Sequence, residues 1–118
     1  EEKKALLKTL EDVQAMIGHM VGVAMESQEN QKEIYKVGLN TSRLLMATGD
    51  LIIAWLLLRQ ADIAQSKLAT AGKDTEFYNG KIASAKFFVR SVLPHISVEG
   101  AVVESESVEI MNISESAF

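Results

Sequence analysis

The chain has 118 residues, of which 47% are hydrophobic and 24% are charged, with a single proline and no cysteine. This composition predicts one globular, helix-rich domain and excludes a disulfide framework, a cysteine nucleophile and a cysteine-based zinc site. The net charge of −4 argues against a nucleic-acid surface, which is normally basic, and weakly against docking on an anionic membrane.

The beginning of the chain and its apolar runs bear on localisation. The chain opens with Glu1 and Glu2 rather than a basic segment followed by an apolar one, so we expect no signal peptide. The missing initiator methionine favours a processed or trimmed chain. The longest uninterrupted apolar run, Leu51–Leu58, has eight residues, too few to cross a bilayer. We therefore expect a cytoplasmic protein with no membrane span.

Apolar residues at alternating steps of four and three predict a first helix over roughly Thr9–Glu26, with a start as early as Glu2. Thr9 followed by Asp12 resembles a capping pair, which leaves the start open. The expected buried stripe consists of Leu6, Leu10, Val13, Ile17, Met20 and Ala24.

A second helix is predicted from about Gln31 to Ala69. Asn30 followed three residues later by Glu33 is a good N-terminal cap signal. The segment Leu44–Leu58 is apolar on nearly every face. Such a segment is usually surrounded by other helices, so we expect it to be the central element of the fold.

Gly72 is typical of a helix C-terminus, and Asp74 or Thr75 is expected to cap a third helix. Pro94 either kinks this helix or starts a new one. Phe77, Phe87 and Phe88 widen the apolar face. The expected stripe consists of Tyr78, Ile82, Ala85, Val89, Val92 and Ile96.

The rest of the chain is weakly helical. Val98–Val108 could form a last short helix, followed by an irregular tail over Met111–Phe118. No strand or hairpin pattern competes with these helices. We therefore predict an all-α fold, in which residues 1–118 form a single helical domain. Its architecture is expected to be an antiparallel helical bundle of three long helices plus a short C-terminal helix or tail.

Residues that could carry chemistry are sparse, and we predict no catalytic, cofactor-binding or metal-ligating residue. A di-iron bundle needs a glutamate three positions before a histidine, and neither His19 nor His95 has one. There is no glycine-rich phosphate loop. The acidic residues near the C-terminus are expected to form a solvated face: Glu99, Glu104, Glu106 and Glu109.

Two charged residues are structural candidates. Asp50 lies inside the most apolar run, and Lys81 lies on the aromatic-rich third helix. A buried unpaired charge costs several kcal/mol, so each must be exposed or have a partner. One hypothesis pairs Asp50 with Lys81 between the second and third helices. The alternative places Asp50 at an exposed kink beside Gly49.

Two segments, Leu39–Ala61 and Phe77–Pro94, carry a resemblance to a known family. The first contains a glycine and, a few residues on, Trp55; the second reads Phe-Tyr, Lys, Ala, an aromatic pair and Leu-Pro. Together they resemble the extra C-terminal domain found on a subgroup of acyl-CoA dehydrogenases. The tail Glu109–Phe118 is similar to that family's ending. Because Trp55 belongs to the first of these segments, it is a third structural candidate.

The resemblance implies a parent oxidoreductase, an FAD-dependent flavoprotein of fatty acid metabolism that oxidises an acyl-CoA thioester to the 2,3-enoyl-CoA. In that family the catalytic base and the flavin contacts belong to upstream domains. This chain would then be an inactive C-terminal fragment of a longer enzyme. Its expected partners are the upstream dehydrogenase domains of the same chain and further copies in a homo-oligomer, with acyl-CoA as the parent's substrate. Phe77 and Phe87 are candidates for the inter-domain contact, with a place in the core as the alternative.

Two other functions stay open at this stage. The chain could be a free-standing helical interaction module that dimerises through its first and third helices. It could also be a small carrier of an acyl chain or acyl-CoA in a cavity of the bundle.

Overall fold

The computed structural model describes residues 1–118 and confirms the predicted all-α class. Its elements are α1 (Glu2–Glu26), α2 (Ile34–Lys67), α3 (Thr75–Ser91) and α4 (Leu93–Ser105). Short 3₁₀ turns cover Gln31–Glu33, Leu68–Thr70, Gly72–Asp74, Glu109–Asn112 and Glu115–Ala117.

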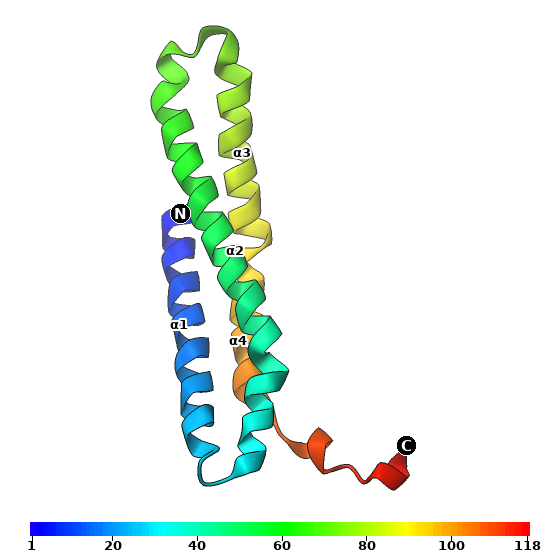
Figure 1. The fold of residues 1–118 in the computed structure, drawn as a ribbon. Coiled ribbons are helices and arrows are strands. Elements are labelled where there is room, and N and C mark those ends of the chain that lie inside the picture. Colours follow the sequence, from blue (N-terminus) through cyan, green and yellow to red (C-terminus); the bar gives the residue numbers. More distant parts are fainter.

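The helices form one elongated body measuring 68 × 30 × 16 Å (Figure 1). The path of the chain runs along α1, back along the full length of α2, and then returns through α3 and α4. α2 contacts α1, α3 and α4, and α1 also packs on α4. α1 begins about midway along α2, so the α2–α3 hairpin extends well beyond the start of α1 (Figure 1). We call this part of the hairpin the overhang.

Most sequence signals between helices lie where they were predicted. The side-chain cap expected for the third helix is not formed: Asp74 stands at the N-cap position of α3 without a capping hydrogen bond, and the Thr75 hydroxyl donates to the Gly72 carbonyl at 2.8 Å. The Asn30 side chain accepts a hydrogen bond from the Lys32 amide at 3.3 Å, and a 3₁₀ turn leads from there into α2. Gly72 has a φ of +54°, a left-handed conformation that favours glycine, and it turns the chain toward α3. Of the two roles considered for Pro94, the structure shows the second. Pro94 lies in the first turn of the new helix α4, where the missing amide hydrogen costs nothing.

The start of α1 lies at Glu2, the earlier of the two limits considered. Thr9 is not a cap. Thr9 lies within α1 rather than at its start. Its side chain is buried, and its hydroxyl donates to the Ala5 carbonyl at 2.9 Å. This bond to the preceding turn satisfies the hydroxyl, so the helix passes through Thr9 without a break.

The buried stripe of α1 is rotated relative to the prediction. Leu10 and Ile17, which were expected inside, are exposed. Val13 and Met20 belong to both stripes because the two faces are adjacent on the helix. The flexible side chain of Met16, 1% exposed, takes the central place against Gly100 of α4. The residues of α1 that are buried are Thr9, Val13, Met16, Met20 and Val23.

α2 is central in position, but the prediction that helices surround its apolar segment is wrong for this chain. Its buried residues are Asn40 and three alanines, Ala47, Ala54 and Ala64. Small side chains let α1, α3 and α4 approach the α2 backbone closely, since the distance between packed helices depends on the side chains at the contact. The large apolar residues of α2 consequently point outward or lie at the margins of the core.

In α3 and α4 the buried residues follow the predicted stripe more closely. Ala85, Val89 and Ile96 are buried, while Tyr78 and Ile82 are half-buried. The last helix begins at Leu93 rather than near Val98, because Leu93, Ile96 and Val103 give α4 its own buried face. The tail leaves the bundle in two 3₁₀ turns (Figure 1).

The apolar composition of α2 also bears on whether the helix could cross a membrane. The stretch Gln31–Thr70 is long and apolar enough, by length and composition alone, to cross a membrane, and only 11% of its most apolar window is buried. The uninterrupted run Leu51–Leu58 understates this, because single polar residues break the run while the mean hydropathy of the most apolar window is still 1.4. The core helix of a soluble protein passes the same test, so this is weak evidence for a span.

Candidate interaction surface

More of the exposed large apolar side chains lie on α2 than on any other helix. Leu45, Ile52, Leu56 and Ile63 follow one another at steps of seven, four and seven residues, which places them on one side of the helix. All four are exposed, and Leu45 is 69% exposed. Monomeric proteins rarely leave contiguous apolar patches of this kind exposed. Such a patch usually marks a site where a partner or another domain packs.

An apolar groove lies beside this face, between the first turns of α1, the second half of α2 and the middle of α3. Its volume is about 800 Å³. Its floor and walls are mainly aliphatic, with Leu6 and Leu10 from α1, Ile52 and Leu58 from α2, and Ile82 from α3. We call it the α1–α2–α3 groove.

Charged residues are among those that line this groove. Glu1, Glu2 and Lys3 come from the start of the chain, Arg59 and Asp62 from α2, and Lys86 from α3. The pKa of Glu2 is lowered, first by a backbone hydrogen bond and further by the amino terminus and two nearby cations, against an opposing effect of burial. Positive and negative groups are therefore mixed around the groove, which gives it no preference for a single sign of charge.

Trp55 lies on the groove wall, where it is 47% exposed. The guanidinium of Arg59, one turn further along α2, lies 5.3 Å from the centre of the Trp55 ring, within cation–π range. The sequence singled out Trp55 through the family resemblance, and the structure places it at the apolar surface instead of in the core.

The hypothesis that Lys81 pairs with Asp50 is wrong in this structure. Lys81 Nζ lies 3.3 Å from Gln60 Oε1 and 5.5 Å from the centre of the Phe77 ring. Gln60 is ten residues beyond Asp50, which is about 15 Å along α2 at the helical rise. The register of the α2–α3 hairpin therefore separates the two charges, and Asp50 is half-exposed beside Gly49.

α3 adds two exposed large apolar residues and α1 adds five, including two that the sequence placed inside. Phe77 and Phe87 are 61% and 69% exposed, so the alternative that placed them in the core is wrong. On α1, Leu10 and Ile17 face solvent as a consequence of the rotated stripe. With Val98 of α4, 63% exposed, large apolar side chains are thus exposed on all four helices.

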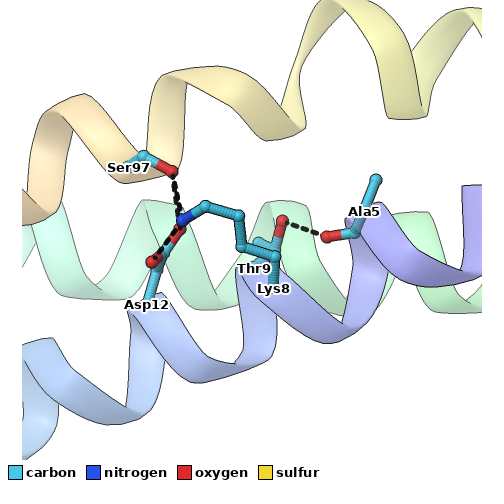
Figure 2. A network of polar contacts seen from close by, with 5 residues as sticks. All are labelled: Ala5, Lys8, Thr9, Asp12 and Ser97. Carbon is cyan, nitrogen blue, oxygen red and sulfur yellow. Dashed lines mark hydrogen bonds and ion pairs between the residues drawn. The ribbon is translucent and has the colours of Figure 1, made fainter.

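Polar contacts between helices fix how α1 and α2 sit on α4. In Figure 2 the Asp12 carboxylate accepts from the Ser97 hydroxyl at 2.6 Å and from Lys8 Nζ at 2.9 Å. Partial burial acts to raise the pKa of Asp12, but the hydrogen bonds from Ser97 and Lys8 outweigh it and the pKa is lowered. On the other side of α4, Arg43 of α2 forms an ion pair with Glu99 at 2.6 Å.

These contacts are structural. The carboxylate of Glu99, expected on a solvated acidic face, instead ties α4 to α2.

No three His, Asp or Glu side chains gather in a way that could hold a metal ion. Only Glu33 Oε2 and Asn40 Oδ1 are buried without a hydrogen-bond partner, and Glu33 is ion-paired with Lys36 at 2.7 Å. Neither residue lines the groove.

Comparison with known proteins gives a consistent result. The family described as acetyl-CoA dehydrogenase C-terminal like matches residues 1–114. The broad-specificity linear acyl-CoA dehydrogenase FadE5 of Mycobacterium tuberculosis is 42% identical over 99% of this chain, and the match covers 20% of that enzyme. Two butyryl-CoA dehydrogenases of Syntrophomonas wolfei are 43% and 41% identical over 51% and 49% of this chain, each match covering 10% of the relative.

The chain thus spans about a fifth of the length of the mycobacterial enzyme. The family match extends over nearly all of the chain and includes all four α-helices. This chain belongs to the acetyl-CoA dehydrogenase C-terminal-like family.

Proposed function

We propose that residues 1–118 are the non-catalytic C-terminal helical domain of a longer, cytoplasmic, FAD-dependent acyl-CoA dehydrogenase. The parent reaction would be the α,β-dehydrogenation of an acyl-CoA thioester. The domain, an antiparallel helical bundle, would pack against the upstream domains of the same polypeptide and support their assembly, including assembly into a homo-oligomer.

The observation that carries this proposal is the inverted distribution of side chains on α2. Alanines face the core, and Leu45, Ile52, Leu56 and Ile63 face outward. Burying one such aliphatic side chain contributes roughly 1.5–3 kcal/mol. A helix that leaves this free energy unused within its own bundle is suited to packing against another domain.

The residues of this chain do not fit FAD. Its pyrophosphate would need several convergent donors, such as the amides of a glycine-rich loop or of a helix N-terminus. The groove instead offers leucine and isoleucine side chains, and its cations Lys3, Arg59 and Lys86 alternate with Glu1, Glu2 and Asp62. We therefore assign the flavin, the catalytic base and the acyl-CoA contacts to the upstream domains, and derive no chemical step in this chain.

The test compares three proteins: the complete enzyme, a truncated form ending just before Glu1, and the 118-residue chain alone. The flavin absorbance, the rate of acyl-CoA oxidation and the molecular mass in solution are measured for each. We expect the complete enzyme to be yellow and active, and the isolated chain to be colourless and inactive. The truncated form should retain a flavin site but assemble or fold less stably, because its docking surface is uncovered.

A different outcome would favour one of the other functions. An antibody against the chain that captures from source cells only a colourless polypeptide of about this length would refute the proposal. Saturable binding of a fatty acyl ligand to that polypeptide would support the carrier function. A concentration-dependent dimer without any flavoprotein would support the interaction module.

A further inference from the structure

The overhang of the α2–α3 hairpin lacks a third helix. Glu2 lies 3.3 Å from Arg90 near the C-terminal end of α3, so α1 begins beside the last turns of α3. From Lys86 back to Thr75, α3 has α2 as its main neighbour. Large apolar side chains remain exposed in this part, including Ile63 of α2 and Phe77 of α3.

The α1–α2–α3 groove opens where the polypeptide begins. Glu1, Glu2 and Lys3 line it together with Leu6 and Leu10 of α1. Any residue joined to the amino group of Glu1 would therefore emerge at the groove. The effective concentration of such a tethered segment at the groove is far higher than that of an untethered partner.

Resting on the proposed function, which places the upstream domains before Glu1, we propose that the stretch of polypeptide directly preceding Glu1 in the complete enzyme fills this groove. The stretch would run along the overhang as the missing third element. The match leaves the greater part of the mycobacterial relative outside this region, and the family is a C-terminal one. The polypeptide required for this role is therefore available in cis.

The dimensions suit a short helix. From Lys86 to Thr75 the overhang measures about 16 Å at the helical rise, so about 11 helical residues would reach its end. A groove of about 800 Å³ accommodates several large apolar side chains. The occupant is expected to be amphipathic, with apolar residues at steps of three and four turned toward Leu58, Ala61 and Ile82.

The experiment uses the fact that the chain has no cysteine. Asp62→Cys and Lys86→Cys place a thiol in the part of the groove that belongs to the overhang, on two different helices. Leu45→Cys is the control, on the same helix as Asp62 but outside the groove. All three positions are exposed, so the fold should tolerate each change, and circular dichroism would verify it.

Maleimide labelling rates are measured in the 118-residue chain, in the chain extended upstream by about 20 residues of the natural polypeptide, and in the complete enzyme. We expect the short extension to slow labelling at both groove positions by about tenfold or more, and to leave the control unchanged. Unchanged rates at both groove positions in the extended chain would refute the inference. Protection that appears only in the complete enzyme would also refute it, because another domain would then fill the groove.

Protection in the unextended chain that rises with protein concentration would refute it as well, by assigning the groove to a second copy. The proposed function is tested separately by the flavin absorbance and activity of the complete enzyme. A yellow, active enzyme with reactive groove thiols would therefore overturn this inference while leaving the proposed function intact.

Discussion

Two glycine-to-alanine substitutions should change stability in opposite directions. Gly100 lies in the interior of α4 with ordinary helical backbone angles, whereas Gly72 has a φ of +54° in the connection between α2 and α3. The same added methyl group therefore meets two different backbone requirements.

At Gly100 the added Cβ would lie 3.7 Å from Met16 Cγ, an ordinary van der Waals contact with a flexible side chain. Alanine also restricts the unfolded chain more than glycine does, which favours the helix by about 0.5–1 kcal/mol. We expect Gly100→Ala to raise the free energy of unfolding by about 1 kcal/mol. At Gly72 no atom obstructs the Cβ, but the left-handed conformation costs a non-glycine residue about 1 kcal/mol or more.

The assay is urea unfolding of the 118-residue chain followed by circular dichroism, with thermal unfolding as a second measurement. A difference of 1 kcal/mol corresponds to a shift of about 4 °C in Tm for a domain of this size. Gly72→Asn is a matched control, since asparagine tolerates the left-handed region better than alanine and should lose less stability. If Gly100→Ala destabilises, or if Gly72→Ala stabilises, the assigned packing of α4 on α1 or the assigned turn is wrong.

Four further predictions follow from the core, the polar contacts and the exposed face. Met16→Ala should lower the free energy of unfolding by about 2–5 kcal/mol in urea titration, because it empties the centre of the α1–α4 contact; a loss below that of an exposed control would contradict the assignment. Asn40→Leu should be neutral or stabilising by up to about 1 kcal/mol in the same titration, because Asn40 Oδ1 is buried without a partner; a large loss would point to an ordered water there. The Asp12 carboxylate should contribute to the free energy of unfolding, measured by comparison with Asp12→Asn. This contribution should be fully present above the ordinary pKa of Asp12, 3.8, and disappear as the pH falls through the lowered pKa of Asp12 in the folded chain; a stability difference that persists at lower pH would exclude the Ser97 contact as its cause. Leu45→Gln should change the stability of the isolated chain by less than about 0.5 kcal/mol but weaken the complete enzyme in thermal unfolding, if α2 docks on the upstream domains; equal effects in both proteins would argue against such docking.

Several of the helix ends could be read from the sequence because short-range chemistry sets them. Asn30 begins the turn into α2 through its own hydrogen bond to a nearby amide, and Gly72 adopts a backbone angle that other residues avoid. Pro94 begins a helix because its ring suits the first turn. Each of these signals acts over two to four residues, so no knowledge of distant neighbours is required. The family, too, could be recognised from the order of residues along the helices.

The buried faces were decided by tertiary structure. On α1 the apolar residues form two adjacent stripes, and periodicity alone does not say which of them meets α2 and α4. On α2, where nearly every face is apolar, the pattern predicted complete burial, whereas the small side chains of Ala47 and Ala54 brought the neighbouring helices to one face. The pairing of Lys81 with Gln60 depends on the register of the α2–α3 hairpin, which the connection between the two helices sets.

The candidate surface therefore could not have been located from the sequence. Leu45 and Ile52 are as hydrophobic as any core residue, and their exposure results from the packing of the rest of the chain. The sequence by itself determined an all-helical chain, the positions of its turns and its resemblance to a dehydrogenase family. Only the tertiary structure decided which apolar residues remain free to contact another part of a larger enzyme, because hydrophobicity drives burial without specifying the partner.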